Sequence, residues 1–130
     1  MKKLILAIAL LLPIACSASD KFGRYRVTYP PDHVTCNSLV LAVNECDHGH
    51  CVDLKTFGDW LMGYISAYNQ GTPDTFDIVA NTDMKSSMTW IVNYCKQHPS
   101  SEYADAVHGL MIDLYPSRQK VRPKNWVEKK

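Results

Sequence analysis

The densest group of chemically reactive side chains in this chain is the stretch from Cys46 to Cys51, which reads Cys-Asp-His-Gly-His-Cys. Thiols, imidazoles and carboxylates are ligand types that suit zinc or copper. The spacing does not match structural zinc sites, because His48 and His50 lie between the two cysteines. In an oxidising compartment the thiols would form a disulfide and leave the histidines on a solvated turn. We favour the disulfide-closed turn, and we expect no bound metal.

A second arrangement consists of Cys95, His98 and His108. It suggests a catalytic cysteine nucleophile, because formation of a reactive thiolate needs a nearby base. No Asp or Asn is placed to orient either histidine, and Cys95 lies on the apolar face of an expected helix. The chain also lacks a glycine-rich phosphate loop, a nucleophile-elbow serine and carboxylates paired at helical spacing. We therefore expect neither an enzyme nor a cofactor.

The N-terminus has the pattern of a secretory signal peptide. Two lysines precede an apolar run over residues 4–15, and small residues suit cleavage after Ala18. This run is shorter than the roughly 20 residues that a membrane-spanning helix needs. An alternative makes Cys16 the lipidated first residue of a lipoprotein, although Pro13 departs from the usual lipobox. We expect export to the periplasm, with residues 1–18 removed and no membrane association unless Cys16 is lipidated.

Without the signal peptide, four cysteines remain for disulfide formation: Cys36, Cys46, Cys51 and Cys95. An even number in an exported domain predicts two disulfides, but four cysteines allow three pairings and the sequence alone does not choose among them. The short separation of Cys46 and Cys51 favours a local ring, which leaves Cys36 to pair with Cys95. That long loop would restrict the unfolded chain by roughly 4 kcal/mol, and the short ring by less.

The charge balance argues against a nucleic-acid partner. The sequence has 14 basic and 13 acidic residues, and Lys2 and Lys3 leave with the signal peptide, so 12 basic residues face 13 acidic ones in the mature chain. The charge is uneven near the C-terminus, where six basic residues between Arg118 and Lys130 are offset by Glu128 alone. Such a run predicts a solvated basic tail, which we place at residues 117–130.

The periodicity of apolar residues predicts an all-α fold, a small disulfide-stapled bundle of three to four helices in residues 34–116. A short extended arm precedes it in residues 19–33, because residues 24–29 alternate in polarity and stop at two prolines. The apolar run over residues 34–43 suits either a strand or a buried helix, and we favour helix. We find no internal repeat.

Three further helices are clearer, because apolar side chains recur at three-and-four spacing. The residues in these stripes are Phe57, Trp60, Leu61, Tyr64, Ile65 and Tyr68, then Met84, Met88, Ile91 and Cys95, and finally Tyr103, Val107, Leu110, Met111 and Leu114. Asn81 or Thr82 would cap the second of these helices, with Asp83 in its first turn.

The exit of the first of these helices is rich in recognition chemistry. Tyrosine and amide side chains on an ordered loop suit protein contacts. The candidate partner-binding residues are Tyr64, Tyr68, Asn69, Gln70 and Asp74. In the simpler interpretation, Tyr64 and Tyr68 only complete the core, with their hydroxyls reaching water.

Several motifs together carry a family resemblance. They are Trp60 to Asn69 (WLMGYISAYN), Pro73 to Ile78 (PDTFDI), Thr82-Asp83, and Trp90 to Cys95 (WIVNYC) followed by His98-Pro99. Over residues 34–115 the chain resembles the Rap/Tai immunity family of type VI secretion, small exported helical proteins that neutralise peptidoglycan amidase toxins. Its size and disulfide use are also similar to the HdeA-type periplasmic acid chaperones.

The resemblance implies a fold, a disulfide and a function. The family pattern pairs a cysteine ahead of the first main helix with the one in Asn-Tyr-Cys, here Cys36 with Cys95, and the segment from Cys46 to Cys51 departs from that pattern. The implied function is inhibition of a cell-wall amidase by occlusion of its active site. The alternatives are an acid-stress chaperone that opens at low pH and a metal carrier using His48 and His50. A homodimer is left open.

Overall fold

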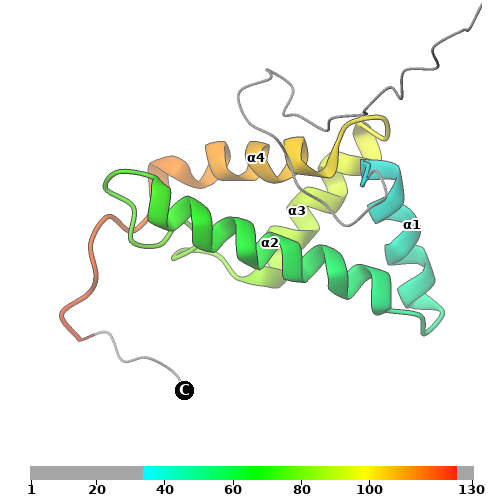
Figure 1. Ribbon diagram of the computed structural model, residues 1–130, viewed down its shortest axis with the longest axis horizontal. Coiled ribbons are helices and arrows are strands. Elements are labelled where there is room, and N and C mark those ends of the chain that lie inside the picture. The colour runs from blue at the N-terminus through cyan, green and yellow to red at the C-terminus, as the bar shows by residue number, and fades with distance from the viewer. Residues whose placement is uncertain (1–33, 126–130) are drawn as a thin grey trace, which may run out of the picture.

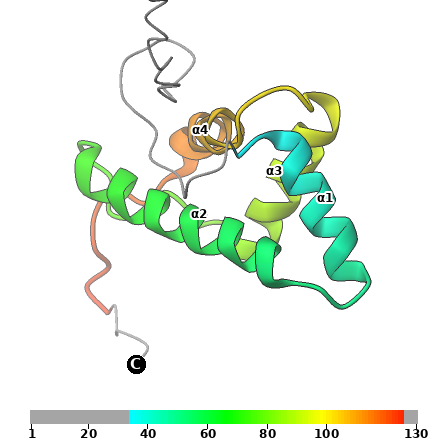
Figure 2. The ribbon, with the colours of Figure 1, turned by 45° about the vertical axis from the view of Figure 1, so that its right-hand side comes forward.

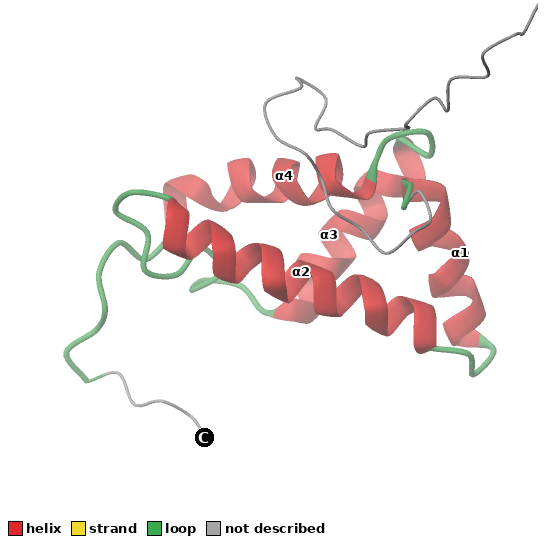
Figure 3. Cartoon of the chain, viewed as in Figure 1, coloured by secondary structure: helices red, strands yellow, loops and turns green. Residues whose placement is uncertain are grey.

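The computed structural model describes residues 34–125. The expected signal peptide with Cys16, the expected N-terminal arm and the last residues of the expected basic tail lie outside this range. Within it the chain forms helices and no strand (Figure 3). The elements are α1 (Cys36–Asp47), α2 (Val52–Gly71), α3 (Met84–Gln97), α4 (Tyr103–Leu114) and a short 3-10 helix, η1 (Tyr115–Ser117). The predicted all-α, disulfide-stapled bundle is confirmed.

Helix α1 packs against α2, α3 and α4, and α3 packs against α1 and α4. In Figure 1, α2 lies across the front, with α3 and α4 behind it and α1 closing one end. Figure 2 looks nearly along α4 and shows α1 beside α3. The 20 residues of α2 span about 30 Å, so the turn before α2 and the loop after it lie at opposite ends of the domain.

Helix α1 starts and stops at clear local signals, which confirms the helical interpretation of residues 34–43. Thr35 caps it by accepting a hydrogen bond from the Ser38 amide, 3.3 Å away. At the other end, the amides of Gly49 and His50 donate to the carbonyls of Cys46 and Glu45, at 2.9 and 3.0 Å. This is a Schellman arrangement, and it needs the positive φ of Gly49, 92°.

Helix α3 begins one residue later than the sequence predicted. The N-cap is Asp83, whose carboxylate accepts a hydrogen bond from the Ser86 amide at 2.6 Å. The predicted cap, Asn81 or Thr82, is therefore wrong. Aspartate is favourable both as a cap and in the first helical turn, so composition alone does not separate the two positions.

The core is formed by side chains of all four helices and of the loop after α2. Its fully buried or nearly buried apolar side chains are Cys36, Leu39, Ala42, Phe57, Leu61, Ile65, Ile78, Ile91, Cys95, Tyr103, Ala106, Val107, Leu110 and Met111. Tyr103 is 0% exposed, and its hydroxyl donates to the Phe57 carbonyl at 3.0 Å. Its ring meets Phe57 edge-on, with centroids 4.9 Å apart. This hydrogen bond offsets the cost of removing the hydroxyl from water, and it fixes α4 against α2.

Both predicted disulfides are present. Cys36–Cys95 joins the first residue of α1 to the last turn of α3, over a separation of 59 residues. Cys46–Cys51 closes the α1–α2 turn, over a separation of 5. Disulfides persist in oxidising compartments and are rare in the reducing cytosol. The two bonds therefore indicate a non-cytoplasmic location.

Candidate partner-binding site

The loop of residues 72–83 connects α2 to α3 at the end of the domain opposite the α1–α2 turn (Figure 1). Glycine at the end of α2 and proline two residues later stop the helix. The five residues predicted to contact a partner lie on the last two turns of α2 and on this loop. The contacts that hold the loop in place determine which of these five side chains are exposed to solvent.

The C-terminal segment pairs with the loop and holds it in place. The amides of Phe76 and Asp77 donate to the Gln119 carbonyl at 2.8 and 3.1 Å, and the Gln119 amide donates back to the Asp77 carbonyl at 2.9 Å. The Asn81 side-chain amide also donates to the Ser117 carbonyl at 2.6 Å. The first residues of the expected basic tail are therefore part of the folded domain. This long-range pairing has no local signal in the sequence.

Arg118 adds a second set of contacts to the same loop. Its Nε lies 3.1 Å from the Asp74 carbonyl and 3.1 Å from Thr75 Oγ1, and it donates to both. Its Nη1 donates to the Tyr115 carbonyl at 2.8 Å, while the guanidinium carbon lies 3.7 Å above the Tyr115 ring. One planar side chain therefore connects the loop to η1, a role that lysine does not reproduce.

Asn69 is half-buried and supports the loop through a hydrogen bond of its side chain. Its Oδ1 accepts a hydrogen bond from the Ile78 amide at 2.9 Å, and Ile78 is 1% exposed. This contact fixes the second half of the loop onto the last turns of α2. Among the candidate residues, Asn69 has a positioning role in the structure.

Gln70 and Asp74 are the exposed members of the predicted site. Asp74 has a φ of 53°, in the left-handed region that aspartate tolerates better than most residues. Arg118 donates a hydrogen bond to the backbone carbonyl of Asp74, which holds the backbone at this position. The Asp74 side chain remains exposed. The last turn of α2 thus presents the amide of Gln70, and the loop presents the carboxylate of Asp74 from a backbone that is held in place.

Tyr64 and Tyr68 are half-buried and belong to an aromatic row along α2. The Tyr64 ring lies 5.2 Å from Trp60 and 6.4 Å from Tyr68, centroid to centroid. Its hydroxyl lies 3.4 Å from Nδ1 of His108 on α4. Tyr64 therefore contributes to the α2–α4 contact. Tyr68 lies one turn further along α2, between Tyr64 and the exposed Gln70.

A matching aromatic row on α3 was not singled out from the sequence. Trp90 stacks on Tyr94 with centroids 5.8 Å apart, and Tyr94 stacks on His98 at 4.3 Å. The spacing, one aromatic residue every four positions, is the same as for Trp60, Tyr64 and Tyr68. This shared spacing was the available signal. Trp90 packs on Gly109 of α4, where a Cβ would lie 3.3 Å from the indole.

The two constellations considered for metal or nucleophilic chemistry have other roles in the structure. Both thiols of the Cys46–Cys51 segment are in a disulfide, and His48 and His50 are exposed on the turn. Between residues 34 and 125, no group of three or more His, Cys, Asp or Glu side chains is placed to hold a metal ion. Cys95 has no free thiol, because it is bonded to Cys36.

Comparison of the chain with protein-family models, with curated proteins and with solved structures gives no significant match. None of the helices in residues 34–125 is long and apolar enough to cross a membrane.

Proposed function

We propose that this protein is an exported binding protein of the immunity type, which inhibits a peptidoglycan amidase by occupying its active-site cleft. The observation that carries the proposal is the loop after α2, whose backbone is held by hydrogen bonds from α2 and from the C-terminal segment. Asn69, Arg118 and Gln119 each bond to it from outside the loop. A loop that is already ordered loses little conformational entropy on binding, which favours tight inhibition.

The chemistry of this surface suits a cleft that handles amide groups. An amidase must bind amide bonds, so its cleft offers hydrogen-bond partners to amide donors and acceptors. The side-chain amide of Gln70 and the carboxylate of Asp74 present such groups at the tip of the domain. Tyr68, half-buried beside them, adds an aromatic ring of the kind enriched in protein interfaces.

The two disulfides support a site of action outside the cytoplasm. Peptidoglycan lies in an oxidising compartment in which Cys36–Cys95 and Cys46–Cys51 would persist. The signal-peptide pattern at the N-terminus agrees with export. We place the protein in the periplasm on these two grounds.

An inhibition assay tests the proposal. The purified protein is mixed with cell-wall amidases encoded in the same genome, first of all any encoded by a neighbouring gene, and release of peptide from peptidoglycan is measured. We expect stoichiometric inhibition of one amidase and protection of cells that export the protein. If no amidase is bound or inhibited, and cells gain no protection, the proposal is wrong.

A further inference from the structure

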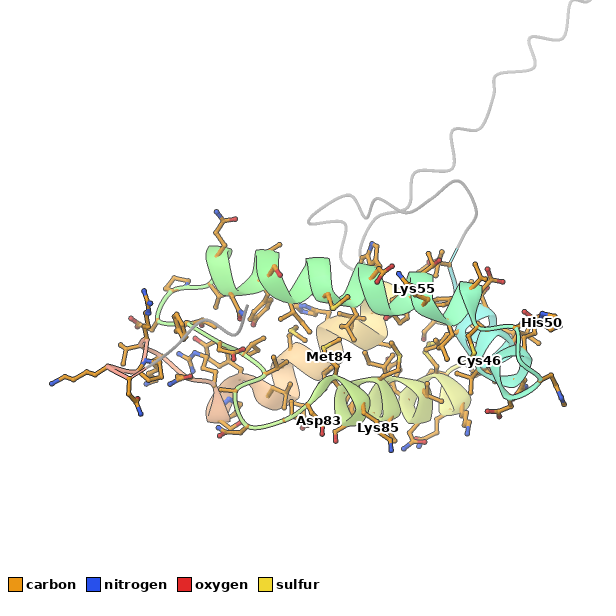
Figure 4. All side chains as sticks on the ribbon, turned by 90° about the horizontal axis from the view of Figure 1, so that it is seen from below. Cys46, His50, Lys55, Asp83, Met84 and Lys85 are labelled. Atoms are coloured by element: carbon orange, nitrogen blue, oxygen red, sulfur yellow. A yellow bond between two sulfur atoms is a disulfide. The ribbon has the colours of Figure 1, made fainter. Side chains whose placement is uncertain are left out.

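The two disulfides differ sharply in their access to solvent. Cys36 and Cys95 are both 0% exposed, within the core between α1 and α3. Cys51 is exposed and Cys46 is half-buried, at the end of the domain where α1 meets α2 (Figure 4). Thiol–disulfide exchange needs direct approach of a thiolate to sulfur. A reductant therefore reaches the Cys46–Cys51 bond in the native state, but reaches Cys36–Cys95 only after the core opens.

The turn between Cys46 and Cys51 is closed by backbone hydrogen bonds as well as by its disulfide. Three backbone hydrogen bonds close it, from the amides of His48, Gly49 and His50 to the carbonyls of Glu45 and Cys46, at 2.9–3.0 Å. The positive φ of Gly49 sets the reversal of the chain. When the S–S bond is cut, these contacts keep the two sulfurs near each other. The bond can therefore open and re-form without unfolding of the bundle.

The two sulfurs lie at helix ends of opposite polarity. Cys51 is the N-cap of α2 and makes no side-chain capping hydrogen bond there. Cys46 lies in the last turn of α1, where the carbonyl end of the helix carries partial negative charge. A thiolate is stabilised at a helix N-terminus and disfavoured at a C-terminus. Cys51 Sγ also lies 3.5 Å from the carbonyl oxygen of Cys46. From the polarity of the helix ends, we expect Cys51 to carry the negative charge in the reduced protein.

We propose that Cys46–Cys51 is a thiol–disulfide exchange site, which reacts with a dithiol reductant or a partner's cysteine pair while Cys36–Cys95 stays intact. A reductant thiolate attacks Cys46 Sγ, and the S–S bonding electrons leave on Cys51 Sγ as a thiolate. The second thiolate of the reductant then attacks the reductant's first sulfur, which is bonded to Cys46 Sγ in the mixed disulfide. This step forms the reductant's internal disulfide and releases Cys46 as a thiolate. Two electrons pass from the dithiol to this protein. In the reverse direction, the Cys46 thiolate attacks a partner disulfide, and the Cys51 thiolate then attacks Cys46 Sγ in the mixed disulfide, re-forms Cys46–Cys51 and releases the partner's dithiol.

Graded reduction tests the selectivity. The oxidised protein is treated with dithiothreitol without denaturant, quenched by alkylation and mapped by peptide mass spectrometry, while circular dichroism follows the fold. We expect Cys46 and Cys51 to be labelled at a reductant concentration at least about tenfold below that needed for Cys36 and Cys95, with the helical signal unchanged. Labelling of all four cysteines together, or labelling of Cys46 and Cys51 only in denaturant, would overturn the proposal.

Two single variants test which sulfur is the thiolate. Cys46→Ser leaves Cys51 free, and Cys51→Ser leaves Cys46 free, with the buried disulfide present in both. We expect iodoacetamide at neutral pH to modify Cys51 several-fold faster than Cys46 in the folded proteins, and the two at equal rates in urea. Equal rates in the folded proteins, or a faster Cys46, would overturn the assignment of Cys51. The double variant with both serines should keep its helical signal, because the backbone hydrogen bonds of the turn do not involve the sulfurs.

Discussion

Asn69 Oδ1 accepts a hydrogen bond from the amide of Ile78, 2.9 Å away and nine residues later in the chain. The contact joins the last turns of α2 to the second half of the loop that follows, and Ile78 is 1% exposed. The conserved geometry of a binding loop usually depends on such supporting residues, which touch no ligand. Here the supporting residue and the exposed residue Gln70 are neighbours in sequence, which allows their roles to be separated.

Removal of the Asn69 side chain should destabilise the domain. We expect Asn69→Ala to lower the free energy of unfolding by about 1–3 kcal/mol, because the buried Ile78 amide loses its acceptor. Urea denaturation measures the change. The matched control is Gln70→Ala, an exposed position where we expect a change within about 0.5 kcal/mol. Equal effects of the two substitutions would contradict the positioning role of Asn69.

Loss of Arg118 should loosen the pairing between the loop and the C-terminal segment. Arg118→Ala removes the hydrogen bonds to Asp74, Thr75 and Tyr115. We expect the amides of Phe76 and Gln119, which bond across this pairing, to exchange with deuterium about tenfold faster. Lys120→Ala, at an exposed basic neighbour, is the control and should leave their exchange unchanged. The account of Arg118 fails if both variants exchange alike.

Two helical glycines should respond differently to alanine. At Gly63 nothing lies within 4 Å of an added Cβ, so we expect Gly63→Ala to stabilise the protein by about 0.5–1 kcal/mol. At Gly109 the added Cβ would lie 3.3 Å from the Trp90 indole, so the ring must shift by a few tenths of an ångström and we expect Gly109→Ala to stabilise less than Gly63→Ala. Thermal or urea unfolding of the two variants measures the difference. Equal stabilisation at both sites would show that Trp90 does not pack tightly on α4.

The cap of α3 should make a pH-dependent contribution to stability. The Ser86 backbone amide, followed by the Ser86 side chain, holds the pKa of Asp83 below its usual value of 3.8. Since the folded pKa is the lower one, the contribution is present in full above about pH 4 and is lost as the pH falls through the folded pKa. Asp83→Ala should therefore be less stable than the unmodified protein at pH 7, and the difference should shrink near pH 2.

Asp83→Asn is the control for this titration. Asparagine caps a helix without ionising, so its effect relative to Asp83→Ala should not change between pH 4 and pH 2. The same acid titration, followed by circular dichroism, addresses the alternative function of an acid-stress chaperone. A chaperone of that kind opens at low pH, whereas an inhibitor needs no such transition. An intact fold at about pH 2 excludes the chaperone.

Local patterns in the sequence predicted the helices and favoured the disulfide pairing that the structure contains. Apolar spacing located α2, α3 and α4, and the short separation of Cys46 and Cys51 favoured the pairing that forms. The start of α3 was misplaced by one residue, because Asp83 suits the cap and the first turn alike. The first residue of a helix depends on which of several possible capping side chains bonds to the free backbone amides. Residue type alone does not predict which one does so.

Long-range contacts were beyond the sequence. The five candidate residues at the exit of α2 were chosen by residue type, and type does not tell Asn69, which bonds Ile78, from exposed Gln70. The pairing of Gln119 with Asp77 joins segments 42 positions apart in a chain with no strand pattern at either. The aromatic row on α3 was readable from its four-residue spacing, which repeats that of α2.

Binding of an amidase to this protein, measured by calorimetry with surface variants, tests the central claim most directly. The account predicts one-to-one binding, with affinity lowered at least about tenfold by Asp74→Arg, which reverses a charge on the exposed loop. It also predicts no change for His50→Ala at the opposite end of α2. An amidase that binds the Asp74→Arg variant as tightly as the unmodified protein would contradict the assignment of the α2–α3 loop as the inhibitory surface.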